Sequence, residues 1–381
     1  MRRRHHDAIK PCAYPPDFPD EIERNTAIGI WGSVAVIGAA AGPTVGGFFL
    51  EHFWWGSVFL LNVPLVAVAI ALTLLLAPPN APNPQKHWDF PSSLYSLITL
   101  ASLVLAIKSL ANNWPVCAAA GVVFACGALA FARRQARLSD PLLTFDIFRS
   151  RIFSGGALTA SGAMFCLAGL ELLSTQKLQL VDALSPLNAG LIISAMALSA
   201  IPTSILGGAT LHHVGFLPLI SGGFLFMAAG MALVVWTGGT MLPLLVCGLV
   251  LTGLGAGLAM SVSSTAIINA APLHRTGMAA GVEAVSYEFG TLISIALTGT
   301  LVPLLMAREL PPHLAELGTD ALYIPASHTA AASAYNSGYL VTIGGLACFA
   351  LLLAAITAWC FRDNPKSGDP YAATEQKDRS S

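Results

Sequence analysis

Residues 38–47 read Gly-Ala-Ala-Ala-Gly-Pro-Thr-Val-Gly-Gly and lie inside an apolar run from Ile28 to Leu50. A run of this length can cross a bilayer as one helix. Because Gly38, Gly42 and Gly46 recur every four residues, they should form a ridge of small residues along one side of that helix. Such a ridge lets a neighbouring helix approach closely in a membrane.

Pro43 lies in the middle of this helix and Gly47 follows the last glycine of the ridge. Pro43 removes one amide donor and crowds a carbonyl one turn earlier, so we expect a bend there. In water, a helix with this composition would be strongly destabilised, whereas neighbouring helices in a membrane can compensate. The stretch therefore indicates a membrane helix that packs closely on a partner.

The composition of the whole chain indicates a polytopic membrane protein. Of 381 residues, 55% are hydrophobic and 10% are charged, against about 25% charged in soluble domains. The mean hydropathy is +0.69, and Gly and Pro are abundant, as membrane helices tolerate. The net charge of −1 indicates no nucleic-acid partner. The scattered cysteines show no metal-ligand spacing, so no metal or cofactor is expected.

The hydropathy pattern predicts an all-α protein with about ten transmembrane helices. We place them near residues 26–50, 56–77, 91–111, 115–132, 152–174, 187–209, 216–236, 242–267, 278–305 and 337–361. Residues 306–336 are expected to form a loop. With the N-terminus inside, sixteen of the 19 Lys and Arg residues fall on the cytoplasmic side, and only Lys108, Lys177 and Arg308 fall on the other. This asymmetry predicts cytoplasmic N- and C-termini, and the expected location is the cell (inner) membrane.

The pattern Gly-x-x-x-Gly-Pro-x-x-Gly-Gly at residues 38–47 resembles the antiporter motif in the fifth helix of drug:proton antiporters of the major facilitator superfamily. The flanking text resembles the fourteen-span multidrug branch. It reads Ala-Ile-Gly-Ile-Trp at 27–31 and Trp-Gly-Ser-Val-Phe-Leu-Leu-Asn-Val-Pro at 55–64. Residues 176–191 are similar to the connection between the first two helices of that family's C-terminal bundle.

The resemblance implies a domain organisation. A basic, disordered tail and loop (1–24) precede the last two helices of an N-terminal bundle (25–78). A linker, two extra central helices and a basic loop (79–149) lead to a six-helix C-terminal bundle (150–362) and a polar cytoplasmic tail (363–381). No stretch resembles the first four helices of the family. We therefore expect a partial major-facilitator fold that is truncated at its N-terminus.

Acidic residues inside spans are the candidates for proton or cation coupling, because ionisable groups in a membrane are costly and mark function. Glu288 and Glu283 lie in the span 278–305, about 140° apart on a helical wheel, and Glu288 is the leading candidate. The alternative for Glu283 is that it lies near the cytoplasmic end and pairs with Arg275. Glu171 is the third candidate, and an interfacial position is an equal alternative for it.

Two aromatic residues, Trp31 and Tyr287, are candidates for stacking on a flat cationic substrate. The more ordinary interpretation is that the aromatic residues near span ends form the interfacial belt. The glycine-rich text at 253–257 superficially resembles a nucleotide-binding loop. It lies inside an apolar span with no preceding strand, so close helix packing is the better interpretation.

The resemblance implies a secondary transporter that exports lipophilic or cationic drug-like compounds in exchange for protons. Its partners would be a small-molecule substrate, protons and the lipid bilayer, and its oligomeric state is unknown. No catalytic motif is present, so no enzymatic activity is expected. The alternative is a truncated remnant that does not transport, or a membrane-embedded partner of another protein.

Overall fold

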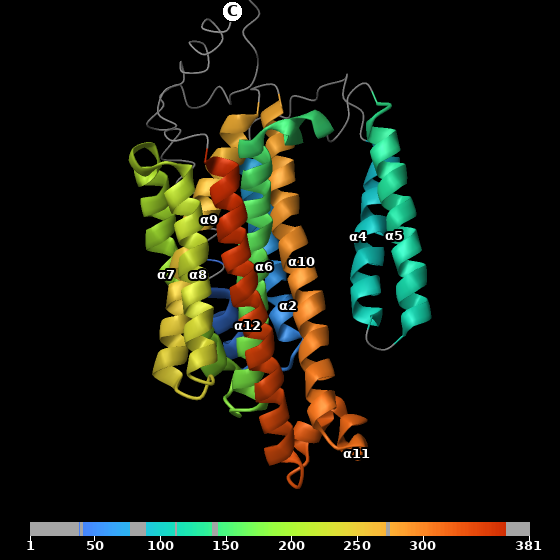
Figure 1. Cartoon of the computed structure of the whole chain (residues 1–381), viewed down its shortest axis with the longest axis vertical. Helices are drawn as coiled ribbons and strands as arrows, with labels where there is room; N and C mark the ends of the chain where they lie inside the picture. Colours follow the sequence, from blue (N-terminus) through green and yellow to red (C-terminus); the bar gives the residue numbers. More distant parts are fainter. Residues whose placement is uncertain are drawn as a thin grey trace, which may run out of the picture.

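The computed structural model describes residue 38 and residues 41–76, 89–110, 113–138, 144–271 and 275–362. Within these residues the chain folds into helices with short connections and contains no strand, and the long helices run roughly parallel (Figure 1). A first helix covers residues 41–52. The others are α2 (Ser57–Leu60), α3 (Asn62–Leu76), α4 (Phe90–Ser109), α5 (Trp114–Gln135), η1 (Phe145–Arg149), α6 (Arg151–Leu180), α7 (Pro186–Val214), α8 (Phe216–Trp236), α9 (Leu242–Ala270), α10 (Thr276–Glu309), α11 (Pro312–Ala315), η3 (Gly318–Tyr323) and α12 (His328–Phe361).

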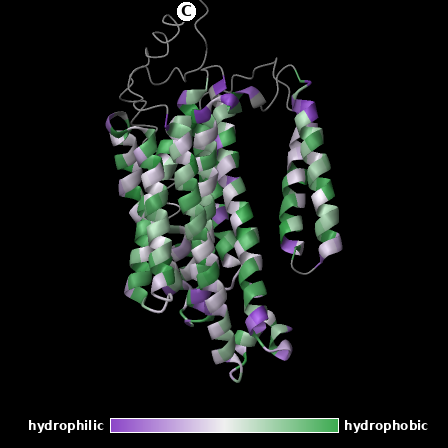
Figure 2. Cartoon of the chain, in the orientation of Figure 1, coloured by the Kyte–Doolittle hydropathy of each residue, from purple (hydrophilic) through white to green (hydrophobic). Residues whose placement is uncertain are grey.

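Nine helices in the described part of the chain are long and apolar enough to cross a membrane. Hydrophilic residues gather at the two ends of the helices, and the middle is mostly apolar (Figure 2). This confirms the predicted all-α, polytopic fold. The remaining predicted span, 26–50, is the first in the chain and lies partly outside the described residues. The described part of it belongs to a helix that runs from residue 41 through Pro43 to residue 52.

Several helices are longer than the hydropathy pattern predicted. α6 continues to Leu180, six residues past the expected end, and α12 begins at His328, nine residues before the expected start. The prediction of a loop at 306–336 was therefore wrong. It contains the end of α10, then α11 and η3, and the first two turns of α12. Packing explains the early start of α12. Ala331, Ala334 and Tyr335 are buried in the core, although the sequence around them is only weakly apolar.

Six helices form the main bundle: α6, α7, α8, α9, α10 and α12. α9 contacts α6, α7 and α8, and α12 contacts α6, α8 and α10. The largest group of buried hydrophobic residues comes from this bundle. In the view of Figure 1, the blue segment that contains α2 and α3 lies behind it. No residue of α3 is buried by the described part of the chain.

Glycines allow the bundle helices to approach backbone to backbone. A Cβ added at Gly253 or Gly257 of α9 would lie under 3.0 Å from a carbonyl oxygen of α7. At Gly255, on another side of α9, the added Cβ would meet the Gly223 carbonyl oxygen of α8. Side chains at these positions would separate the helices, which is how small residues act at membrane helix contacts. The glycine-rich text at 253–257 therefore serves helix packing.

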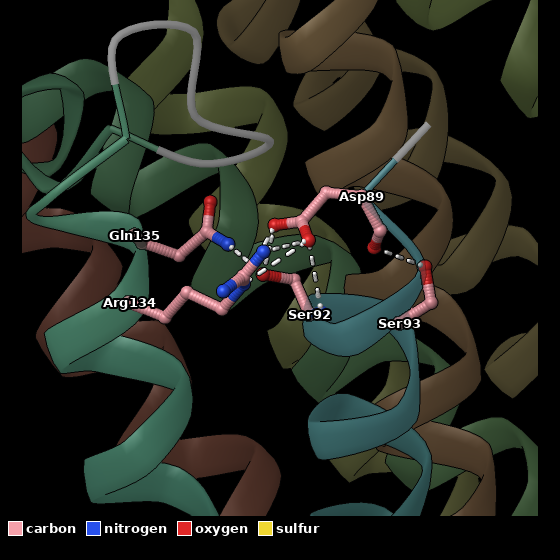
Figure 3. A network of polar contacts seen from close by, with 5 residues as sticks. All are labelled: Asp89, Ser92, Ser93, Arg134 and Gln135. Atoms are coloured by element: carbon pink, nitrogen blue, oxygen red, sulfur yellow. Dashed lines mark hydrogen bonds and ion pairs between the residues drawn. The ribbon is translucent and has the colours of Figure 1, made fainter. Parts of the chain in front are cut away.

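The hairpin of α4 and α5 stands to one side of the bundle (Figure 1). Its helix ends are joined by a polar network. Asp89, the N-cap of α4, accepts hydrogen bonds from Arg134 of α5, with Nη2 to Oδ1 at 2.6 Å and Nε to Oδ1 at 3.0 Å. The Gln135 amide donates to the Ser92 hydroxyl at 2.7 Å. Figure 3 shows these side chains converging between the two helices. The network fixes the distance between α4 and α5 at one end of the hairpin.

The Asp89 carboxylate should support this joint only in its charged form. The hydrogen bonds from Arg134, and then from Ser92, lower the pKa of Asp89 to about 2. A carboxyl whose folded-state pKa is depressed contributes stability above its unfolded pKa and loses it as pH falls through the folded pKa. We expect the thermal midpoint of the wild type to exceed that of Asp89→Asn by a constant amount above about pH 5, because Asn keeps the cap but not the charge.

The difference between the two midpoints should shrink between about pH 4 and pH 2. Scanning fluorimetry of both proteins over this range measures the two midpoints, and taking their difference removes acid effects common to both. A difference that stays constant down to pH 2 would contradict the role of the charge.

An ion pair with a buried ammonium and an exposed carboxylate lies at the opposite end of the main bundle from the start of α6. The Lys177 side chain is 2% exposed, and its Nζ lies 2.7 Å from Oδ2 of Asp182, which is 37% exposed. The ammonium is also 6.0 Å from the centre of the Tyr339 ring. The pair joins the last turn of α6 to the segment after it, where Ala183 has a positive φ of 52°.

Candidate transport interface

The helix over residues 41–52 packs tightly on the N-terminal half of α7. A Cβ added at Gly47 would lie under 3.0 Å from the Pro186 carbonyl oxygen. One added at Gly190 of α7 would meet the Pro43 carbonyl oxygen at an equally prohibitive distance. The hydroxyls of Thr44 and Ser194 lie 2.6 Å apart across the same contact. Two glycines, one from each helix, therefore set the close approach, because at both positions the obstacle is backbone.

The contact face differs from the ridge that the sequence pattern predicted. Apart from the neighbouring backbone of its own helix, no heavy atom of the described chain comes within 4 Å of a Cβ added at Gly38, Gly42 or Gly46. Residues that follow each other by one position are about 100° apart on a helix. The helix is rotated so that the side bearing Pro43, Thr44 and Gly47 meets α7, and the four-residue glycine ridge points elsewhere.

Glu283 lies two turns inside α10, half-buried, next to Tyr287. The Tyr287 hydroxyl lies 3.2 Å from Oε1 of Glu283 and 3.4 Å from the carbonyl oxygen of Met260 in α9. Arg275 does not pair with Glu283. Its guanidinium binds Asp146 at 2.9 Å instead. Glu283 is thus a membrane-embedded carboxyl group with a phenol as its neighbour and no described cation beside it.

Glu288 occupies a different side of α10, as its spacing from Glu283 required. It is exposed, on a stripe that also carries Val285, Leu292 and Ile295. Glu171 is half-buried on α6. Because α6 runs on to Leu180, Glu171 lies about 13 Å from the end of its helix, deeper than the sequence pattern suggested. Neither acid forms an ion pair with another described residue.

Of the two aromatic residues predicted to stack on substrate, only Tyr287 lies within the described residues. Trp31 lies outside the described residues. Tyr287 is half-buried between α9 and α10, with its hydroxyl directed at Glu283 and Met260. Trp54, Trp55 and Trp114 are exposed at helix ends, as residues of an interfacial belt would be. Within the described chain, no group of three or more His, Cys, Asp or Glu side chains is arranged to hold a metal ion.

Sequence reasoning missed Thr44, Ser194 and Gly190 as parts of this contact. Gly190 lies in a stretch of sequence that resembles the family. It does not belong to a row of glycines repeating every four positions, so nothing in the sequence predicts a helix packed against it. A single small residue indicates close packing only when the opposite helix is known. The pairing of Thr44 with Ser194 spans 150 positions and has no local signal.

Apolar helices of this number and length, with charge at their ends and carboxyl groups inside, define a multi-pass helical membrane protein. The family model for the Major Facilitator Superfamily matches residues 14–295, and the chain belongs to this family.

Several curated relatives of the chain are named for drug resistance or efflux. It is 32% identical over 289 residues to the methyl viologen resistance protein SmvA of Salmonella typhimurium, covering 75% of this chain and 58% of SmvA. It is 34% identical over 292 residues to the multidrug efflux pump LfrA of Mycolicibacterium smegmatis, covering 74% of this chain and 57% of LfrA. The chain thus spans somewhat more than half the length of these relatives.

Among solved structures, a bacterial homologue of the human lysosomal transporter Spinster, in an inward-facing and unoccupied conformation, matches with a TM-score of 0.55. The sequences are 18% identical, and the match covers 93% of this chain and 74% of the other. This likeness concerns the fold alone.

Proposed function

We propose that the chain works in secondary active transport, exporting lipophilic or cationic compounds in exchange for protons. The observation that carries the proposal is the contact of the helix over residues 41–52 with α7. The stretch that resembles the antiporter motif meets the main bundle there, backbone to backbone. A tight seal at this position supports exchange because it limits proton leakage along the contact. The names of SmvA and LfrA support a cationic, drug-like substrate class.

In this proposal, residues 25–78 supply the last two helices of an N-terminal bundle and residues 150–362 form the C-terminal bundle. Residues 79–149 supply the extra helical pair and its linkers, and 1–24 and 363–381 are tails. Transporters of this kind bind substrate near the bilayer midplane, where two repeats meet and rock. The contact of Pro43 and Gly47 with α7 would belong to that meeting surface.

We propose cytoplasmic termini and the cell (inner) membrane as the location. The start of α4, the end of α5, the start of α10 and the end of α12 lie at one end of the molecule (Figure 1). These ends carry Arg133, Arg134, Arg275 and Arg362. Lys108 and Arg308 belong to the other ends of α4 and α10. An excess of basic residues marks the cytoplasmic side.

Proton coupling is assigned to Glu283 first, with Glu288 and Glu171 as the other candidates. Ionisable groups inside a membrane helix are costly and mark function. Glu283 combines half-burial with a hydroxyl neighbour on Tyr287, which can donate to the carboxylate or accept from the protonated acid. Exposed Glu288 lacks this enclosure in the described chain. Tyr287 would position Glu283 rather than stack on substrate.

An antiport assay in everted membrane vesicles tests this function. Respiration acidifies the vesicles, and methyl viologen is then added as the probe cation. We expect vesicles that contain the chain to lose their pH gradient on addition, because cation entry releases protons. Glu283→Gln should abolish the response, since the amide cannot carry the proton. Glu316→Gln, an exposed acid in the connection after α10, is the matched control and should respond normally.

If no cationic probe dissipates the gradient, the chain is not an antiporter by itself. The alternative of a membrane-embedded partner would then be favoured, and the uncovered α3 is the observation that supports it. If Glu283→Gln responds normally but Glu288→Gln does not, the coupling site belongs on the exposed stripe of α10.

A further inference from the structure

The end of the α4–α5 hairpin that carries its basic residues contains a hollow of about 280 Å³. Tyr95 of α4 forms one wall. The other wall is one side of α5 and the short turn after it, formed by Ala130, Arg133, Arg134, Arg137 and Leu138. Ala130, Arg133 and Arg134 are spaced three and four residues apart and share one face of α5, and Arg137 and Leu138 lie in the turn that follows this helix. Three guanidinium groups therefore line one small hollow.

Most of the positive charge in the hollow is uncompensated by the described chain. Asp89 neutralises Arg134, which uses its Nε and Nη2 atoms on that carboxylate. No described acid pairs with Arg133 or Arg137, both of which are exposed. The Nη1 atom of Arg134 and the hydroxyl of Tyr95 likewise make no hydrogen bond to another described residue. The hollow thus offers several donors and an excess of two positive charges, which suits an anion.

The depth of the hollow in the membrane identifies the kind of anion. Trp114, 77% exposed, begins α5 at one interface. From Trp114 to Arg133 the helix rises about 29 Å, close to the roughly 30 Å thickness of the hydrocarbon core. Arg133 and Arg137 therefore lie at the level of the lipid headgroups on the opposite side. Only 6% of the apolar window of α5 and 11% of that of α4 is buried within the described chain, which leaves most of the hairpin surface open to lipid.

We propose that this hollow binds an anionic phospholipid, whose headgroup phosphate is held by Arg133 and Arg137 between α4 and α5. Arg134 positions the site, because its ion pair with Asp89 holds the two helix ends together beside the hollow. Ala130 and Leu138 supply apolar wall for the glycerol and the first acyl carbons. Basic pockets between membrane helices bind acidic headgroups by this combination of charge and shape.

Native mass spectrometry of the full chain in detergent, titrated with phosphatidylglycerol or with zwitterionic phosphatidylcholine, tests the proposal. The wild type should bind the first phosphatidylglycerol more tightly than phosphatidylcholine. The double variant R133Q/R137Q should bind phosphatidylglycerol roughly 25-fold more weakly, at about fivefold for each basic side chain near the surface. Its affinity for phosphatidylcholine should not change.

The matched control is R149Q/R362Q. It removes the same charge from two exposed arginines, in η1 and at the end of α12, outside the hollow. This variant should bind phosphatidylglycerol like the wild type. If both double variants lose it equally, the arginines act only as bulk positive charge and the site does not exist.

Two further measurements separate the sources of the anion and guard against misfolding. Inorganic phosphate that displaces phosphatidylglycerol from the wild type at comparable concentration would show a free-anion site, and would overturn the assignment to a lipid. Added salt should weaken phosphatidylglycerol binding to the wild type, because Coulombic attraction is screened. If R133Q/R137Q does not fold, binding to the wild type that is indifferent to salt would still contradict the proposal.

Discussion

Replacing Gly47 by alanine is expected to force the helix over residues 41–52 away from α7. The new Cβ would lie under 3.0 Å from the Pro186 carbonyl oxygen and the Leu187 Cα, which are backbone atoms and cannot rotate aside. Overpacking of this kind costs about 1–3 kcal/mol. Gly190→Ala should act in the same way from the other helix, because its Cβ would meet the Pro43 carbonyl group.

Gly46→Ala is the matched control, one residue away on the same helix. It adds the same methyl group where no described heavy atom lies within 4 Å. Alanine in place of a helical glycine normally stabilises by about 0.5–1 kcal/mol. The thermal midpoint of the purified chain should therefore fall for Gly47→Ala and stay level or rise for Gly46→Ala. The opposite order would mean that the ridge of Gly38, Gly42 and Gly46, and not Gly47, makes the tight contact.

A disulfide reports the separation of the helices directly. The hydroxyls of Thr44 and Ser194 lie 2.6 Å apart, so cysteines at these two positions should be within bonding reach after small adjustment. We expect the T44C/S194C pair to form a disulfide efficiently on mild oxidation. Adding Gly47→Ala should reduce the yield, and adding Gly46→Ala should not. Equal yields in the two backgrounds would remove Gly47 as the determinant of close approach.

The outcome for this helix shows where sequence reasoning stops. Apolar length and glycine spacing were enough to predict a membrane helix that packs closely, since both depend on local composition. A ridge of period four tells which residues share a side of the helix, but not which side meets the partner. Rotation about the helix axis is decided by α7, where Gly190 and Ser194 provide the complementary gap and hydroxyl. Tertiary contacts of that kind leave no mark in the spacing of one segment.

The ends of the helices were missed for a related reason. A hydropathy scale identifies the residues that prefer lipid. α6 and α12 extend beyond their apolar segments because the ends of the two helices pack on each other. The Tyr335 hydroxyl lies 3.2 Å from the Gln176 side-chain oxygen, and the hydroxyls of Ser174 and Tyr339 are also 3.2 Å apart. Polar residues in these turns satisfy one another, so the helices continue where a hydropathy scale ends them.

Lys177 was placed by charge alone on the outer side, with no sign that it is buried. Asp182 follows Lys177 by five positions, which would put the two side chains about 140° apart on a continuous helix. The helix ends at Leu180, and the positive φ at Ala183 belongs to a turn in which Asp182 folds back over the last turn. Only the break in the helix brings the ammonium and the carboxylate together.

The asymmetry of this pair leads to the second large effect. Asp182→Asn should destabilise the chain by about 3 kcal/mol, because it leaves the ammonium of Lys177 buried and uncompensated. Lys177→Met should cost much less. Its side chain has a similar length, it removes the buried charge, and it leaves Asp182 in contact with solvent through its 37% exposed surface. The Tyr339 ring and the Gly239 turn that cover the Lys177 stem would cover methionine equally well.

Thermal midpoints of the wild type, both single variants and K177M/D182N measure this difference. The double variant should be more stable than Asp182→Asn alone, since it no longer contains the unpaired ammonium. That rescue distinguishes a buried charge from a simple loss of the hydrogen bonds that the two residues share, because in that case the double variant would be as destabilised as either single variant. If Lys177→Met proves as destabilising as Asp182→Asn, the ammonium contributes net stability through its partners, and its burial costs the fold less than we infer.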